Sequence, residues 1–191
     1  MAVTQSRTLR WNVDDYHKLA EQGWFEGKRV ELIAGEIIAM SPIGSRHWTA
    51  VNKISSLFHH LLGHQFIVST QNSLRLSQYS EPEPDIALIE GKFDDYRDAL
   101  PRTAVLIIEV SDTTLADDRR EKASLYAYAA IADYWLLNLN DNQLEVHRQP
   151  VAMADQPFGY GYQEVTIYKR EEAVTALAAP AVPIAVADLL P

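Results

Sequence analysis

Three consecutive stretches decide the fold of this chain: AVLIIEV at residues 104–110, DDRREKASLYAYAA at 117–130 and YWLLNL at 134–139. The first stretch is apolar on both faces and rich in β-branched side chains, which predicts a central strand that is covered on both sides. The second stretch has helical spacing, and its two leading aspartates favour a helix N-terminus. Strand, helix and strand in this order indicate a crossover unit that places its helix on one face of the sheet.

Further elements are predicted on both sides of this unit. Toward the N-terminus the pattern predicts a helix that starts at Asn12 or Asp14 and ends at Glu21, a hairpin at 29–40 and a longer helix at 45–62. Short strands are predicted at residues 66–69, 74–76, 86–89, 144–148, 162–168 and 182–186, and the polar span 90–102 predicts a loop with room for one helical turn. The fold class is therefore α/β (α+β), a mixed β-sheet flanked by helices, with hairpins toward both ends.

The composition predicts one domain over residues 1–191. The chain has 191 residues, of which 47% are apolar and 23% charged, so it can bury a substantial core. It has no cysteine, which excludes disulfides and thiolate metal sites. The longest apolar tract, 173–190, contains Pro180, Pro183 and Asp188, which disfavours a membrane span, and no secretory signal begins the chain. We expect a cytoplasmic protein with no membrane association.

The net charge limits how the chain could act on nucleic acid. The formal charge is −9, and no dense run of lysine and arginine is present. A protein that holds DNA by general electrostatics should be basic, because phosphate neutralisation supplies most non-specific affinity. A chain of this charge that acts on nucleic acid needs a local basic patch, a bound metal or a partner.

Three residues are the main candidates for chemistry. Asp85 follows a proline directly before the apolar run 86–89, Glu109 interrupts the central strand, and Lys122 lies in the helix-like stretch that follows. Two carboxylates on neighbouring strands with a nearby ammonium group can bind a hard divalent cation and direct a water molecule at a phosphodiester. These residue types in this order therefore indicate metal-dependent hydrolysis.

Each of the three candidates also has an ordinary structural explanation. The aspartate is typical of a turn. Glu109 could form an ion pair with Arg119 or Arg120. Lys122 could be an exposed lysine that pairs with Asp118, four residues earlier. Against this last alternative, the lysine shares a helical stripe with apolar residues, which predicts a position toward the core.

Other polar residues are weaker candidates. Glu31 breaks the apolar run of the predicted N-terminal hairpin, where it could face a site or solvent. His47 lies near the start of a predicted helix and could approach a site, although a cap or a surface position is the commoner role. Three further histidines fit a helix surface: His59, His60 and His64. No nucleophile elbow or phosphate-binding glycine loop is present.

Short motifs follow one another in a distinctive order along most of the chain, from about Val13 to Leu190. They are VELIAGE at 30–36, MSP at 40–42, His47, PD at 84–85, IEVS at 108–111, Asp117, Lys122, Tyr126 and YW at 134–135. As an ordered set they resemble the Uma family of putative restriction endonucleases, within the PD-(D/E)XK nuclease superfamily. The set is much more specific than any of its members.

This resemblance implies a restriction-endonuclease-like fold and hydrolysis of phosphodiester bonds, most naturally those of DNA, with Mg²⁺ or Mn²⁺ as cofactor. It implies that Asp85 and Glu109 are metal ligands and that the backbone carbonyl of Val110 is a third. Glu31 corresponds to the acidic residue of the superfamily's first motif, which assists the metal or the water. His47 and Gln71 are accessory positions.

One departure from the superfamily pattern concerns the lysine. The pattern expects lysine two residues after the second carboxylate, where this chain has Ser111. The resemblance implies that Lys122 on the following helix takes this role, which requires it to reach the attacking water.

Superfamily enzymes often cut two strands as symmetric dimers, so a homodimer is also expected. Two other functions stay open: a nuclease-like scaffold that binds nucleic acid or a protein without cutting, and a metal-dependent hydrolase with a different substrate.

Overall fold

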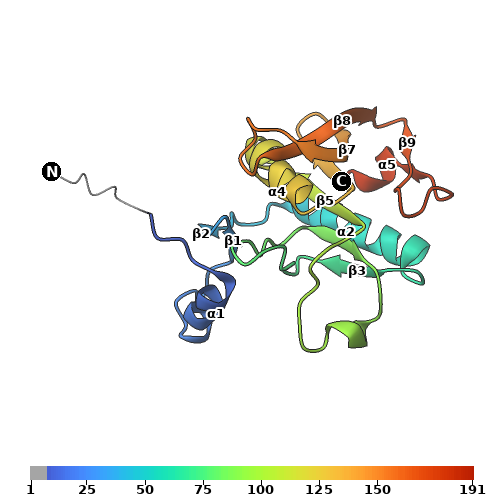
Figure 1. The fold of residues 1–191 in the computed structure, drawn as a ribbon. Coiled ribbons are helices and arrows are strands. Elements are labelled where there is room, and N and C mark those ends of the chain that lie inside the picture. The colour runs from blue at the N-terminus through green and yellow to red at the C-terminus, as the bar shows by residue number, and fades with distance from the viewer. Residues whose placement is uncertain (1–7) are drawn as a thin grey trace.

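The computed structural model describes residues 8–191 and contains a central six-stranded sheet (Figure 1). Its strands are β3 (Ile67–Thr70), β4 (Ile86–Ile89), β5 (Leu106–Ser111), β6 (Asp133–Asn138), β7 (Gln143–Ala152) and β8 (Tyr160–Lys169), in the spatial order β3-β4-β5-β6-β7-β8. The pair β5–β6 is parallel and every other pair in this sheet is antiparallel. The mixed sheet and the predicted crossover between β5 and β6 are confirmed.

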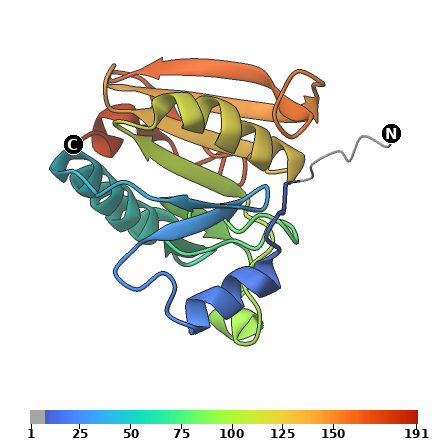
Figure 2. The same cartoon turned by 90° about the vertical axis from the view of Figure 1, so that its left-hand side faces the viewer.

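Helices cover both faces of the sheet (Figures 1 and 2). One face carries α2 (Ser45–Leu62) and α5 (Val186–Leu189); the other carries the helical connection made of α3 (Leu115–Asp117), the π-helical η2 (Asp118–Lys122) and α4 (Ala123–Tyr128). Side chains of β5 alternate between the two cores: Leu106, Ile108 and Val110 pack toward α2, whereas Ile107 faces α4. By the same alternation Glu109 points to the α4 side.

Smaller elements lie at both ends of the described chain. The N-terminal part contains α1 (Val13–Glu21) and the antiparallel hairpin of β1 (Val30–Ile33) and β2 (Glu36–Ala39); η1 (Phe93–Tyr96) is a helical turn, and β9 (Ala173–Val174) pairs with β10 (Ile184–Ala185). Asn12 caps α1 by accepting a hydrogen bond from Asp15 N at 2.9 Å. Figure 2 shows the β1–β2 hairpin in front of the sheet and next to α4. The predicted fold class, with small hairpins toward both ends, is confirmed.

Several predicted boundaries are wrong. Residues 74–76 form no strand, because Leu74 N donates to Pro82 O and Arg75 N to Pro101 O, two loop carbonyls that do not continue one ladder. The strand predicted at 182–186 has two residues, and Val186 already begins α5. The helical connection runs over 115–128 rather than 117–130, and it ends where Ala130 adopts a left-handed φ of 59°.

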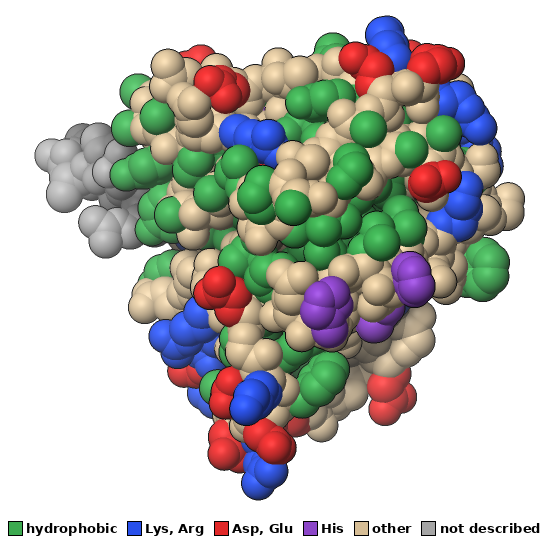
Figure 3. All heavy atoms as spheres, turned by 90° about the vertical axis from the view of Figure 1, so that its right-hand side faces the viewer, with side chains coloured by type: hydrophobic (Ala, Val, Ile, Leu, Met, Phe, Trp, Pro, Cys, Tyr) green, Lys and Arg blue, Asp and Glu red, His purple; other side chains and the backbone are tan. Residues whose placement is uncertain are grey.

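Within residues 8–191, none of the helices combines the length and the apolar character needed to cross a membrane. The face of the molecule away from the β1–β2 hairpin is apolar at its centre, with lysine and arginine scattered among acidic side chains at its margins (Figure 3). This face therefore carries no continuous basic track.

Candidate active site

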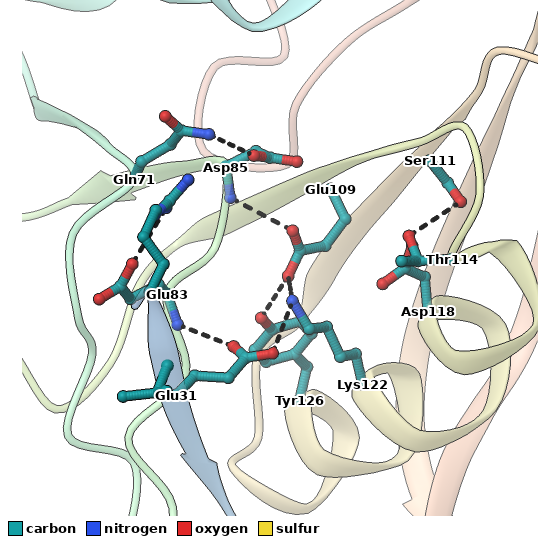
Figure 4. A network of polar contacts seen from close by, with 12 residues as sticks. Glu31, Gln71, Glu83, Asp85, Glu109, Ser111, Thr114, Asp118, Lys122 and Tyr126 are labelled. Carbon is teal, nitrogen blue, oxygen red and sulfur yellow. Dashed lines mark hydrogen bonds and ion pairs between the residues drawn. The ribbon is translucent and has the colours of Figure 1, made fainter. Parts of the chain in front are cut away.

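The ends of β4 and β5 bring the two candidate carboxylates together (Figure 4). Asp85, directly before β4, donates its backbone N–H to Glu109 Oε2 at 3.2 Å, and Val110 N donates to Asp85 Oδ2 at 2.9 Å. The two residues are 7% and 3% exposed. Strand pairing thus holds the carboxylates side by side at the edge of the core. The contribution of Val110 seen here is its N–H, which orients Asp85.

Lys122 reaches this pair from the helical connection. Its Nζ donates to Glu109 Oε1 at 3.0 Å, and the phenol of Tyr126 donates to the same oxygen at 2.6 Å. The lysine side chain is 13% exposed. The alternative of a surface lysine paired with Asp118 is therefore wrong.

Among the described residues, neither of the two arginines considered for Glu109, Arg119 and Arg120, forms an ion pair with it. Arg119 donates to both carboxylate oxygens of Glu145, at 2.9 and 2.6 Å. Glu109 is held instead by a lysine and a tyrosine that lie one helical turn apart.

The π-helical turn η2 positions the lysine. Asp118 O accepts the backbone N–H of Ala123, five residues later, and also the phenol of Tyr134 at 3.0 Å. The Asp118 side chain is buried and accepts from Thr114 Oγ1 at 2.6 Å. Asp118, Lys122 and Tyr126 are spaced by four residues and therefore share one side of the helical connection. Single π-turns occur frequently at functional sites.

Glu31 forms a further wall of the site. It is 5% exposed, its Oε2 accepts the backbone N–H of Glu83 at 3.1 Å, and its Oε1 lies 3.5 Å from Lys122 Nζ. The solvent-facing alternative for Glu31 is wrong, because the hairpin turns this side chain inward. The ammonium group therefore lies between two carboxylates that belong to distant parts of the chain.

The two accessory positions both contact Asp85. His47, in the first turn of α2, lies with Nε2 3.0 Å from Asp85 Oδ2, and its buried Nδ1 has no hydrogen-bond partner. Gln71 donates its side-chain N–H to Asp85 Oδ1 at 3.0 Å and its backbone N–H to Asp85 O at 3.1 Å. It does so in a left-handed conformation with φ of 51°. A non-glycine residue in this region is strained, and such strain clusters at functional sites.

Charge in the site is unevenly compensated. Burial raises the pKa of Glu109, Asp85 and Asp118 raise it further, and Lys122 offsets this increase in part. Burial lowers the pKa of Lys122, but Glu109, Glu31 and Asp118 outweigh burial and raise it, so the ammonium group stays charged. Burial also opposes ionisation of Asp85, yet the hydrogen bond from His47 and the N–H of Val110 hold its pKa below the usual value. The site therefore has more buried negative charge than its one lysine neutralises.

A cavity of about 750 Å³ opens above these residues. Most of its lining comes from the β1–β2 hairpin, the segment that leads into α2, the end of β5 with the loop and helical connection after it, and the loop between β7 and β8. Arg10, Gln71, Glu83 and Asp85 add to it. Nine aspartates and glutamates line it, against three residues of lysine and arginine: Arg10, Arg29 and Lys122. The lining is therefore strongly acidic, which favours a cation inside.

The residues present fit a magnesium or manganese ion. Asp85 Oδ1 and Glu109 Oε2 each accept one hydrogen bond, so each keeps a free lone pair. Mg²⁺ is usually bound through one or two carboxylates together with waters and substrate phosphates, rather than by a complete protein cage. In the part of the chain that the structure describes, no group of three histidine, cysteine, aspartate or glutamate side chains is arranged to hold a metal. The donor set thus suits an ion that substrate and water complete.

Sequence reasoning did not assign a role to two residues of this network. Tyr126 donates to Glu109, and Asp118 lies buried beside the site. Their spacing of four residues on either side of Lys122 was the available signal. A lysine predicted to face the core implies that its neighbours one turn away face it too.

Comparisons with known proteins identify a family and a fold. The model of the Uma2 family, described as "Putative restriction endonuclease", matches residues 13–187. The crystal structure of a putative nuclease belonging to DUF820 from Anabaena variabilis ATCC 29413 is similar over 93% of this chain and 96% of that chain, with a TM-score of 0.66 and 14% sequence identity. At this identity the similarity shows the fold. No curated protein matches the chain.

Proposed function

The chain belongs to the Uma2 family of putative restriction endonucleases, and from this premise we propose that it is a metal-dependent endonuclease that hydrolyses phosphodiester bonds of DNA. Asp85 and Glu109 hold the metal ion, Mg²⁺ or Mn²⁺. When bound, this ion lowers the pKa of water and offsets negative charge that develops on the phosphoryl group. The acidic cavity supports the proposal, because a cation is needed there before a phosphate can enter.

The surrounding side chains orient the ligands. His47, Gln71 and the N–H of Val110 all contact the carboxylate of Asp85. Tyr126 and Lys122 fix one oxygen of Glu109 and leave the other toward Asp85. Supporting hydrogen bonds of this kind keep metal ligands within the narrow range of productive geometry.

Lys122 positions the attacking water and adds positive charge near the phosphoryl oxygens. Glu31 holds the ammonium group from the opposite side at 3.5 Å. The water releases a proton to solvent as its oxygen forms a bond to phosphorus, one ester P–O bond breaks, and the leaving ester oxygen takes up a proton from solvent. The products are one phosphate monoester and one hydroxyl end.

The observation that carries the proposal is the 3.0 Å contact between Lys122 Nζ and Glu109 Oε1. In this chain the lysine comes 13 residues after the second carboxylate instead of two, and the π-turn with α4 returns it to the same carboxylate. The three chemical groups of the superfamily's site therefore lie together although their sequence spacing differs.

The test is cleavage of mixed DNA and RNA substrates with Mn²⁺, with Mg²⁺ and with a chelator. Wild type should cut DNA only with metal, and Asp85→Asn should lose this activity. Lys122→Met should cut about 10²-fold more slowly, since it loses a charge at the transition state. Glu164→Gln changes an exposed carboxylate on β8 and should match wild type. Equal cleavage by Asp85→Asn and wild type would contradict the assignment.

A scaffold that binds without cutting is the second candidate. The acidic lining supports this candidate, because nine carboxylates against three basic side chains repel the phosphates that a nuclease must bind. Calorimetric titration with Mn²⁺ separates the two functions, because a scaffold with an inactive site should show no binding that depends on Asp85. Light scattering on the same sample tests the predicted homodimer.

A further inference from the structure

We propose, on the basis of the function above, that this site acts on an unpaired DNA strand rather than on phosphates within an intact duplex. A family described by the word restriction would suggest duplex cleavage. The burial of the reacting groups and the size, apolar walls and negative charge of the cavity instead favour a substrate that enters as a single unpaired strand.

The reacting groups lie at the floor of the cavity. Asp85, Glu109 and the side chain of Lys122 are 7%, 3% and 13% exposed. A volume of about 750 Å³ is in the range of pockets for small molecules, about 300–1,000 Å³. A cavity of this size suits a small part of one strand and not an intact duplex. We therefore expect a scissile phosphate to reach the floor when its strand leaves the helical stack.

Walls around the floor come from separate parts of the chain. The β1–β2 hairpin lies in front of the sheet (Figure 2), and its Glu31 contacts Lys122 on the floor. Residues 40–44 before α2, residues 112–114 after β5 and residues 157–158 between β7 and β8 complete the lining. A groove for a double helix would need two open ends, whereas these segments surround the floor from several directions.

The upper walls offer apolar surface to an unstacked base. Ile38 and Ile43 are 38% and 40% exposed and both line the cavity, as does the half-buried ring of Phe158. Bases that leave the stack are held by stacking on aromatic side chains and by contact with apolar ones. Arg10 in the same lining can meet a flanking phosphate, whereas Arg29 is paired with Glu83 at 3.1 Å.

The negative charge of the cavity lining also disfavours a duplex. Double-stranded DNA carries about one charge per 1.7 Å of its axis, so a duplex laid across this mouth would bring many phosphates toward nine carboxylates. The opposite face carries no continuous basic track that could compensate (Figure 3). A single flexible strand can present one phosphate to the metal-loaded floor and direct the others away.

The experiment compares two DNA dumbbells that share their end loops and one strand of the stem, while the opposite strand differs only in a short central stretch. One is fully paired in its stem, and the other has a short unpaired bubble in the stem centre. With Mn²⁺ the full-length protein should cut within the bubble at least about tenfold faster than it cuts the paired stem. Equal or faster cleavage of the paired stem would overturn the proposal.

Variants of the apolar wall test the same inference. Phe158→Ala should raise KM for an unpaired strand about tenfold, the range expected for loss of one stacking contact. Phe93→Ala is the matched control, because this ring is 80% exposed on η1 and does not line the cavity. Identical KM values for Phe158→Ala and wild type would argue against a base in this wall.

Binding separates a failure of this inference from a failure of the proposed function. If wild type cuts no substrate, the nuclease proposal fails, and fluorescence anisotropy with Mn²⁺ then decides the inference by itself. Tighter binding of the bubble than of the paired dumbbell supports entry of an unpaired strand. Equal affinity, or no binding of either, contradicts it. Lys122→Met, which keeps both proposed metal ligands and is checked for folding by circular dichroism, provides the same measurement with slower cleavage.

Discussion

The sheet buries two carboxylates on adjacent strands, Asp133 at the start of β6 and Glu109 near the end of β5, in contrasting surroundings. Asp133 is fully buried and accepts hydrogen bonds from Trp135 Nε1 at 2.8 Å, Arg148 Nε at 2.9 Å and Leu177 N at 2.8 Å. Arg148 also donates to Thr175 O at 2.6 Å. In this Asp133 cluster one guanidinium neutralises one carboxylate, and the contacts join β6 and β7 to the C-terminal segment.

Glu109 is equally buried but is not neutralised in the same way. In the Glu109 cluster, made of Glu31, Asp85, Glu109, Lys122 and Tyr126, there are three buried carboxylates and one ammonium group, which pairs with Glu31 and Glu109. The cluster opens to a cavity, and none of the residues of the Asp133 cluster lines this cavity. A buried charge whose partner is removed destabilises the fold strongly, whereas buried charge in excess beside a cavity is suited to bind an ion. Four predictions test this contrast.

The largest expected effect is on cleavage by Glu109→Gln. Loss of one metal ligand should lower the rate about 10³-fold, or about 4 kcal/mol of transition-state stabilisation. The free energy of unfolding should stay within about 1 kcal/mol of wild type or increase, since an incompletely compensated buried charge is removed. Cleavage assays and urea denaturation of one preparation measure both quantities. A strongly destabilised variant would mean that Glu109 is structural like Asp133.

The converse effect is expected from Arg148→Met. This change leaves Asp133 buried without its cation and should lower the free energy of unfolding by about 3 kcal/mol. Below the unfolding transition its cleavage rate per folded molecule should equal that of wild type, because Arg148 does not line the cavity. Urea titration and single-turnover cleavage check these outcomes; a loss of activity without loss of stability would contradict the contrast.

Metal binding should distinguish the two clusters by a smaller change in the free energy of unfolding. Mg²⁺ at about ten times its Kd should stabilise wild type by about 1.4 kcal/mol. The same increase is expected in Arg148→Met and none in Glu109→Gln. Thermal melts with and without Mg²⁺ provide the measurement, and samples treated with a chelator are the reference. Stabilisation of Glu109→Gln equal to that of wild type would place the ion elsewhere.

His147 supplies a buried group of a third kind, without a strong partner. Burial lowers its pKa to about 4, with a smaller opposing effect of Glu145. Between about pH 6.5 and pH 4 the unfolded chain binds a proton that the folded chain does not, so the free energy of unfolding falls as the pH decreases. From about pH 7.5 to about pH 5.5 this loss should be about 1.3 kcal/mol. His147→Phe, in a site lined by Tyr134 and Tyr162, should lack this contribution.

The sequence predicted the fold correctly in segments where one local pattern, either apolar or helical, dominates. The run at 104–110 is apolar on both faces, and it became a central strand; the spacing at 45–62 predicted α2 to the residue. The segment 74–76 is equally short and apolar, yet its hydrogen bonds go to Pro82 and Pro101, which lie far away in the sequence. Short strands depend on partners that local sequence does not identify.

The sequence likewise identified only part of the candidate site. Glu109 stood out because a carboxylate in a doubly covered strand needs compensation, and Asp85 because it precedes the neighbouring strand. Whether Glu31 faces solvent or the core was left open, because alternation assigns a face of the hairpin but not what covers that face. The contact with Lys122 decided it.

The sequence by itself determined which strands are buried, which face of the helical connection is apolar and which residues could act as metal ligands, because periodicity and residue chemistry are local properties. The tertiary structure alone decided that Glu31, Asp85, Glu109 and Lys122 converge and that a narrow acidic cavity lies above them. Convergence depends on strand order, on the path of the hairpin and on one π-turn. Packing between residues that are distant in the chain sets these features. The spacing of residues along the sequence carries no information about such packing.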